Sequence, residues 1–305
     1  MNNQLTQLNS TLAIWSQALL EDSEVSDATK ATYRQGMRKF LEWCNKNKIE
    51  KVTPAVIRKW KADLLHDKKP STVNTWLAGV RYFYRQAVET GQLRDNPTLG
   101  IDGARRKGSK RHKRQAFTDA EIRRILAGPD QATTMGKRDY ALLMLKSYCA
   151  IRDVEIHRAD LTDLTTQDNQ VLLFVQGKGS TEKDEPKVVP PMAADALYSW
   201  LAARGPEAGP LFTSLSDRSF AGRLGMSTIR HLVLGYIRLA GVVDPRKTSH
   251  SFRHTAITSA IRHGAAIQKV SAMAGHLSLD VTGQYYHEVD RLTDPAELYV
   301  GYDEK

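Results

Sequence analysis

Residues 103–114, GARRKGSKRHKR, contain seven Arg or Lys, two Gly and no large apolar side chain. A segment of this composition cannot bury a core of its own, so it is expected to connect two separately folded parts. The whole chain has 305 residues, 41% of them hydrophobic, which is enough for two domains of ordinary size. The sequence therefore predicts a domain over residues 1–102, a basic linker over 103–115 and a second domain over 116–305.

The first part of the chain has the apolar periodicity of amphipathic α-helices. An early run starts near residue 7, and each later run follows a signal for a helix start, at Ser26, Thr53 and Pro70. Gly91 is placed to end the last of these runs. The pattern predicts an all-helical module over residues 7 to about 100.

The second part combines helical runs with a single hairpin. Thr118 and Glu121 form a capping-box pattern before an apolar run. The β-branched run 171–175 is followed by a glycine-containing turn and a return strand at 187–190. Apolar residues at helical spacing mark further helices over residues 140–148, 193–204, 227–241, 250–263 and 267–274. The chain is thus predicted to be mainly α with a small β-hairpin or sheet (α+β).

Net charge and cysteine usage limit the partner and the compartment. The formal net charge is +10 and the pI about 9.5, which favours a polyanionic partner, DNA before membrane. The sequence has no run of about 18 apolar residues for a membrane span and no secretion-signal pattern at its start. Cys44 and Cys149 lie in apolar helical patterns, which indicates reduced core thiols and a cytoplasmic protein.

The stretch 250–287 gathers groups suited to phosphate chemistry. His250 and Arg253 are three residues apart on a predicted helix and so share a face. His276 follows the next helix, and Tyr285 comes nine residues later. Arg offers a planar fork to phosphate oxygens, His exchanges a proton near neutral pH, and a Tyr hydroxyl can act as a nucleophile.

A zinc site is an alternative interpretation of the same stretch. His250 and His254 form an i,i+4 pair, and His276 or His287 could supply a third ligand. The pattern lacks the Glu of an H-E-x-x-H motif, and Arg253 would place a cation beside the metal. We therefore disfavour zinc.

The order of these residues resembles the tyrosine recombinases, the family of phage integrases and of Cre- and Xer-type recombinases. The H-x-x-R box of that family is matched by His250 and Arg253, and its G-H box by Gly275 and His276. The nucleophilic tyrosine, usually nine residues past that histidine, falls on Tyr285.

Two earlier boxes of the family are also present. Residues 150–155, AIRDVE, resemble its first arginine box, with Ala150 where Gly is commoner, and Glu155 would brace Arg152. The family's catalytic lysine commonly lies in a GKG turn, which places it on Lys178. The following loop is more acidic than usual, so Lys183 or Lys187 stays an alternative.

The resemblance implies a helical, SAM-like core-binding domain followed by a catalytic domain. It also implies a site-specific recombinase or integrase that cuts and rejoins DNA through a 3′-phosphotyrosine, without metal or ATP. A catalytically inactive DNA-binding protein and a type IB topoisomerase-like enzyme are the alternatives. The catalytic residues implied are Tyr285, Arg152, Lys178, His250, Arg253 and His276, with Glu155 in support.

The expected partner is a double-stranded recombination site with inverted repeats, bound by a homotetramer that exchanges the C-terminal tail, residues 291–305. The core-binding domain would contact DNA through one polar helix face, and the linker through its cations. The candidates are Lys69, Thr72, Asn74, Thr75 and Arg81 on the helix, and Arg105, Arg106, Lys107, Lys110, Arg111, Lys113 and Arg114 in the linker.

Overall fold

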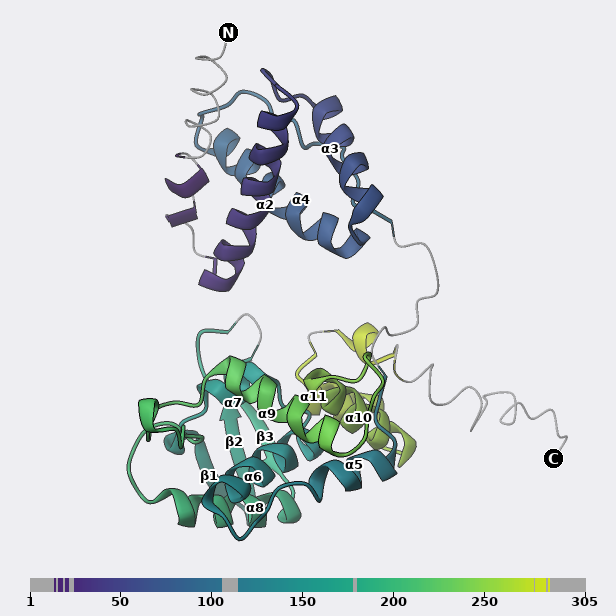
Figure 1. Cartoon of the computed structure of the whole chain (residues 1–305). Helices are drawn as coiled ribbons and strands as arrows, with labels where there is room; N and C mark the ends of the chain where they lie inside the picture. The colour runs from purple at the N-terminus through teal and green to yellow at the C-terminus, as the bar shows by residue number, and fades with distance from the viewer. Residues whose placement is uncertain are drawn as a thin grey trace, which may run out of the picture. The chain divides into compact units, whose positions relative to one another are not determined.

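The computed structural model divides the chain into two compact units, Met1–Ser109 and Lys110–Lys305 (Figure 1). None of the described helices is both long enough and apolar enough to cross a membrane. The structure describes residues 25–105, 115–177, 180–276 and 278–283, together with residues 14, 16–18, 20, 21 and 285.

Helices α2 (Asp27–Lys46), α3 (Pro54–Asp67) and α4 (Pro70–Glu89) make up most of the described part of the first unit (Figure 1). The predicted helix starts are confirmed: the side chain of Ser26 caps α2, and that of Thr53 caps α3. The early run near residue 12 lies mostly outside the described residues.

Two glycines let α2 and α4 cross with their backbones in contact. A Cβ atom on Gly36 would lie 2.5 Å from the carbonyl oxygen of Trp76, and one on Gly79 would lie 2.6 Å from that of Tyr33. A larger side chain at either position would push the helices apart. The core beside this crossing is aromatic and aliphatic, and it includes Phe40, Ile57, Trp60, Leu77 and Phe83.

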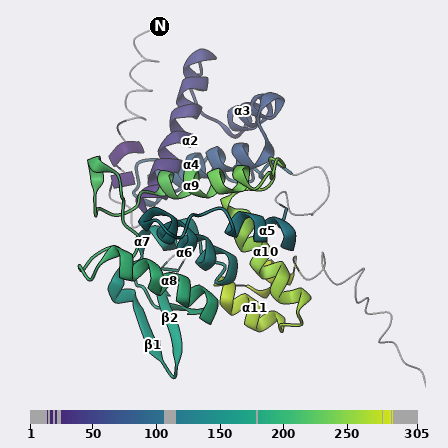
Figure 2. The same cartoon turned by 60° about the horizontal axis from the view of Figure 1, so that its bottom comes forward.

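The second unit is built around α6 (Thr134–Tyr148), whose residues 141–145 are almost inaccessible to solvent. These five consecutive residues are all apolar and cover every side of that part of the helix, so this part belongs in the interior. The helices around it are α5 (Asp119–Leu126), α7 (Asp153–Arg158), α8 (Pro191–Arg204), α9 (Met226–Leu239), α10 (Ser249–Arg262) and α11 (Ile267–Ala274). In Figure 2, α11 lies beside α10.

The sheet has three antiparallel strands in the order β1–β2–β3, namely Leu164–Gln167, Gln170–Val175 and Glu185–Val189. The hairpin of β2 and β3 confirms the prediction, but β1 was missed. Its sequence, LTTQ, is too short and too polar to show a strand period. Along β3 the side chains alternate, so that Lys187 and Val189 both point to the buried face.

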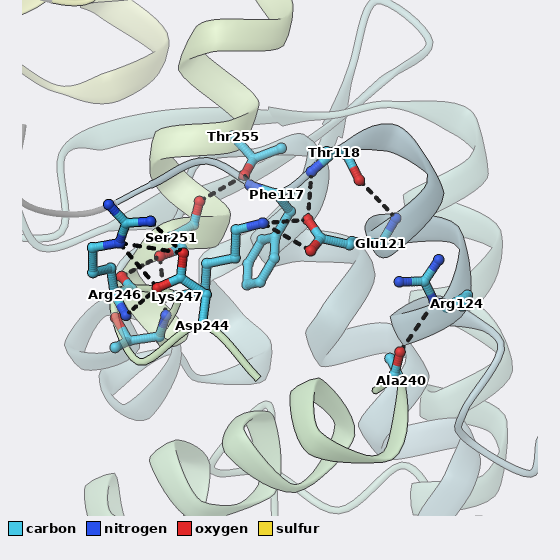
Figure 3. A network of polar contacts seen from close by, with 11 residues as sticks. Phe117, Thr118, Glu121, Arg124, Ala240, Asp244, Arg246, Lys247, Ser251 and Thr255 are labelled. Atoms are coloured by element: carbon cyan, nitrogen blue, oxygen red, sulfur yellow. Dashed lines mark hydrogen bonds and ion pairs between the residues drawn. The ribbon is translucent and has the colours of Figure 1, made fainter. Parts of the chain in front are cut away.

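A polar network ties α5 to the segment that leads into α10 (Figure 3). Both carboxylate oxygens of Glu121 accept hydrogen bonds from Lys247 Nζ, at 2.7 and 2.6 Å. The same ammonium lies 5.9 Å from the ring centre of Phe117, whose backbone N–H donates to Thr255 Oγ1 at 2.8 Å. The network fixes the first turns of α10 against α5, and α10 begins one residue before His250.

Candidate active site

Arg152 stands at the N-terminal cap of α7, where Glu155 holds it at two points. The Arg152 backbone N–H donates to Glu155 Oε2 at 2.7 Å, and its guanidinium pairs with Oε1 of the same carboxylate. Glu155 is 1% exposed. The Glu155 carboxylate therefore caps α7 and also orients the Arg152 guanidinium, as a residue that supports Arg152 should.

Arg253, on α10, donates to the carbonyl of Ala274, which also accepts a hydrogen bond from Arg152. Its side chain is buried, with Nη1 donating to the carbonyl of Ala150 at 2.7 Å and Nη2 to that of Ala274. Burial lowers the pKa of Arg253 to about 10, with the nearby charge of Arg152 adding to the effect. Arg253 stays charged at neutral pH, so its guanidinium adds a cation beside Arg152.

The C-terminal end of α11 is the acceptor on which these cations converge. Arg152 Nη2 reaches the carbonyls of Ala274 and Gly275 at 3.4 and 3.3 Å, and Arg253 also donates to Ala274. Lys187 donates to the carbonyl of the preceding residue, Met273, at 2.7 Å. Such carbonyls carry the negative end of the helix dipole, which cations stabilise. The helix ends at Ala274, as predicted, and Gly275 follows it in the left-handed region, with φ 57°.

His276 follows directly and lies against Tyr285. The two rings are 6.2 Å apart and nearly parallel, while the His254 ring meets Tyr285 edge-on at 4.8 Å. His276 Nδ1 is 2.8 Å from the hydroxyl oxygen of Thr282. Burial, together with the charges of Arg253 and Arg152, lowers the pKa of His276 to about 4. The imidazole is therefore neutral at physiological pH.

Tyr285 is held by a small apolar cluster that is separate from the main core of the unit. Its ring is 7% exposed and packs with side chains of α10 and α11. The cluster comprises Ala150, Ala256, Ile257, Ile261, Val270 and Ala274. The predicted nucleophile thus lies beside Ala150, the residue whose carbonyl receives Arg253.

A half-buried carboxylate connects the segments that carry Arg152 and His250. Asp153 accepts hydrogen bonds from Lys146 Nζ at 2.5 Å and from Ser249 Oγ at 2.6 Å. Burial lowers the pKa of Lys146; it would raise that of Asp153, but Lys146 and Ser249 hold that pKa below its ordinary value. The Lys146 ammonium is buried and would be costly to leave without its partner, so the Asp153 contacts fix α6, α7 and α10 relative to one another. No sequence pattern pointed to this contact.

His250 is the second residue of α10 and is exposed, whereas Arg253 on the next turn is buried. The two residues share a helix, as predicted, and differ in burial because the first turn opens to solvent. Lys178 lies outside the described residues. Of the alternatives, Lys183 pairs with Asp160 and Asp163 at 2.8 and 2.5 Å, whereas Lys187 reaches α11.

The candidate DNA contacts in the first unit differ in their environment. Asn74 bonds to both the N–H and the carbonyl of Ala104, at 2.6 and 3.0 Å, and Arg81 donates to the carbonyl of Ile101. Through these bonds, both side chains hold residues 101–104 against α4. A role in DNA binding stays a prediction for them.

The other candidates in this group are more accessible or lie beyond the described part of the chain. Lys69, Thr75 and Arg105 are exposed, and Thr72 is half-buried. The remaining linker cations lie outside the described residues; they are Arg106, Lys107, Lys110, Arg111, Lys113 and Arg114.

The zinc interpretation gains no support from the described part of the chain, which contains no group of three or more His, Cys, Asp or Glu residues arranged to hold a metal ion. His254 Nδ1 lies 3.2 Å from Thr258 Oγ1, and its ring packs on Tyr285. His287 lies outside the described residues. The two cysteines are free and buried, as predicted.

Ala150 has φ 51°, a left-handed conformation that disfavours any side chain. We expect Ala150→Gly to stabilise the second unit by about 0.5–1 kcal/mol, because relief of about 1–2 kcal/mol of strain exceeds the entropy cost of glycine. Urea unfolding midpoints of the full chain would measure it. Ala202→Gly, at an exposed position of α8, is the matched control and should destabilise by about 0.5–1 kcal/mol. A lower midpoint for Ala150→Gly would contradict the strain.

Two models of phage-integrase domains match this chain. Residues 115–291 match the family model described as "Phage integrase family", and residues 12–91 match "Phage integrase, N-terminal SAM-like domain". The chain is 28% identical over 283 residues to tyrosine recombinase XerD of Pseudomonas putida, covering 88% of this chain and 90% of that protein. It is also 28% identical over 305 residues to tyrosine recombinase XerC 2 of Ralstonia nicotianae, covering 92% and 84%.

Solved structures share the fold. The XerH site-specific recombinase in a post-cleavage complex with a palindromic difH substrate superposes with a TM-score of 0.71 at 16% identity, covering 88% of this chain and 79% of that one. A lambda integrase tetramer bound to a Holliday junction superposes with a TM-score of 0.68 at 15% identity, covering 98% and 80%. Because the first family model alone spans more than half of the sequence, this chain belongs to the phage integrase family of tyrosine recombinases.

Proposed function

We propose that this tyrosine recombinase cuts and rejoins double-stranded DNA at specific sites, with Tyr285 as the nucleophile and a 3′-phosphotyrosine as the intermediate. One observation supports it most. Arg152 and Arg253 converge on the end of α11, and the next residue, His276, lies against Tyr285. Two cations, a neutral imidazole and a phenol are thereby brought together from four segments of the chain.

The proposed reaction is an in-line exchange at phosphorus. The Tyr285 oxygen forms a bond to phosphorus, the bond from phosphorus to the 5′ oxygen breaks, and that oxygen leaves as a hydroxyl. A tyrosine hydroxyl has a pKa near 10 in water, so its proton must be taken up during attack, and His250 is assigned that task. Lys178 supplies a proton to the leaving oxygen.

The two arginines stabilise the charge that develops on the non-bridging oxygens of the phosphate. His276, neutral at physiological pH, donates one hydrogen bond to the same group. Rejoining reverses these steps with a 5′ hydroxyl from another strand. The phosphotyrosine conserves the energy of the broken bond, so neither ATP nor a metal ion takes part.

A trapping experiment tests this function against its alternatives. A duplex selected by the protein from a randomised pool would be nicked near each candidate cleavage position, so that the released fragment diffuses away and the covalent adduct accumulates. We expect an adduct that survives denaturant and chelator. Binding without an adduct would indicate an inactive DNA-binding protein, relaxation of supercoiled DNA of any sequence a topoisomerase, and loss with chelator a metal enzyme.

We further propose that the recombination site has inverted repeats, that four copies of the chain assemble on two duplexes, and that the reaction takes place in the cytoplasm. The proposal includes the domain limits 1–102, 103–115 and 116–305, with the linker cations neutralising DNA phosphates. Strand exchange between two duplexes needs four cleavage centres, and each chain supplies one proposed nucleophile. A head-to-tail contact that closes a ring of four meets that need.

Residues 291–305, which lie outside the described residues, are the proposed connection between neighbouring subunits. They contain Leu292, Leu298, Tyr299 and Val300, more apolar surface than a free tail normally keeps. Removal of residues 292–305 should spare folding and single-site binding but weaken paired-site complexes and, with them, recombination. Native gels on two-site DNA would measure this. A truncated protein that recombines normally would show that the tail folds on its own subunit.

A further inference from the structure

A second carboxylate lies at the reactive centre, and the reaction proposed above does not use it. Glu185 is the first residue of β3, and its Oε1 accepts a hydrogen bond from Lys187 Nζ. A Cβ atom on Gly275 would overlap this carboxylate, and one on Gly177 would lie 2.8 Å from its Oε2. The carboxylate is therefore packed against the backbone of Gly275, whose carbonyl receives Arg152 and which immediately precedes His276.

Glu185 is held less firmly than Glu155, the other carboxylate of the site. Glu155 is almost fully buried and takes two bonds from Arg152. The Glu185 side chain is 22% exposed, and its partner Lys187 has a second acceptor in the carbonyl of Met273. Glu185 can thus leave Lys187 without stranding a buried ammonium group, whose isolation would be costly.

The charge of Glu185 acts on the groups that are proposed to bind phosphate. Burial lowers the pKa of Arg253 and of His276, and the negative charge of Glu185 opposes both changes. A carboxylate and a phosphodiester carry the same charge and bind the same donors. Two such anions in one partly buried place repel each other, so they compete for it.

We propose that Glu185 occupies the position of a scissile-phosphate oxygen and competes with DNA for the cations of the reactive centre. Engagement of the phosphate requires the Glu185 carboxylate to turn outward to solvent. Lys187 keeps its hydrogen bond to Met273 and then donates a second hydrogen bond to the phosphate in place of Glu185. Glu185 thereby lowers the affinity of the reactive centre for phosphate and slows cleavage. The inference rests on the proposed function, because it takes the competing anion to be the scissile phosphate.

The first test needs no cleavage. Inorganic phosphate would be titrated into the full chain while its melting temperature is followed, since a ligand stabilises the state that binds it. Glu185→Gln should bind phosphate roughly tenfold more tightly than the wild type, because one nearby like charge is removed. Glu182→Gln is the matched control: it removes the same charge from an exposed position of the same hairpin and should behave as the wild type.

The second test measures single-turnover cleavage of the nicked duplex. Glu185→Gln should form the covalent adduct about five- to tenfold faster than the wild type at equal DNA occupancy. An unchanged or slower rate, or unchanged phosphate affinity, would overturn the proposal. Glu185→Ala supplies the same comparison if the Gln variant folds poorly. If the wild type itself forms no adduct, the proposed function fails, while the phosphate titration still decides whether Glu185 competes for the anion site.

Discussion

Tyr285→Phe should abolish the covalent protein–DNA adduct completely while leaving DNA binding unchanged. The variant lacks only the hydroxyl oxygen, and its ring can keep the contacts with His254 and His276 and the apolar cluster of α10 and α11. A missing nucleophile cannot be replaced by stronger binding, so the expected effect is loss of the reaction rather than a slower rate. The measurement is adduct formation on the nicked duplex, with binding followed by gel shift.

Tyr286→Phe is the matched control because it makes the same change one position along. Tyr286 lies outside the described residues, but neighbouring positions of a helix point about 100° apart, so only one of the two tyrosines can face the phosphate. We expect Tyr286→Phe to form the adduct at a rate close to that of the wild type. The assignment of Tyr285 fails if the two variants exchange these results.

Arg152→Ala and Arg253→Ala should each slow cleavage by about 10²–10³-fold, the usual cost of removing one preorganised donor to a transition-state oxyanion. DNA binding should change little in comparison, since it is spread over many cations. Rates of adduct formation at saturating DNA, set beside equilibrium binding, would separate the two effects. Proportional loss of binding and cleavage would mean that the arginines only anchor DNA.

At Arg253, a conservative substitution is also needed. Arg253 is buried and satisfies the carbonyls of Ala150 and Ala274, so its replacement by Ala also leaves a cavity and unpaired acceptors. Arg253→Lys keeps the charge and most of the volume, but it cannot hold two acceptors in the geometry of a guanidinium, so cleavage should still fall. Arg158→Ala, at an exposed position in the last turn of α7, is a suitable control and should cleave normally.

Sequence alone located the features that depend on neighbouring residues. Ser26, Thr53 and Thr118 were identified as helix caps, and each makes the expected bond to a backbone N–H within three residues. The helix predicted over residues 267–274 has the same limits in the structure, and Gly275 directly after it adopts the left-handed conformation common at helix ends. These interactions form within one turn of chain, so the local sequence is enough to specify them.

The order of the arginine, histidine and tyrosine boxes was also visible, because it is a property of spacing along the chain. Their convergence was not. Arg253 meets Ala150 across 103 residues, and Ser249 meets Asp153 across 96. Such pairs depend on how α6, α7, α10 and α11 pack, and helical periodicity says which face is buried without saying what that face will touch.

Only the tertiary structure decided the surroundings of the groups that are proposed to bind phosphate. In the sequence, Lys187 is one of three candidate lysines, and no motif singles out Glu185. The period of two along β3 places Glu185 and Lys187 on the face that carries Val189. This alternation could have indicated from the sequence that both side chains point inward. Lys187 reaches the carbonyl of Met273 across 86 residues, however, and packing against α11 sets that contact. Sequence thus determined the helices, their caps and the set of candidate reactive groups, because local bonds and spacing encode them. Structure decided which cation faces which carbonyl or carboxylate, because burial and charge pairing between distant segments are settled only when the chain is folded.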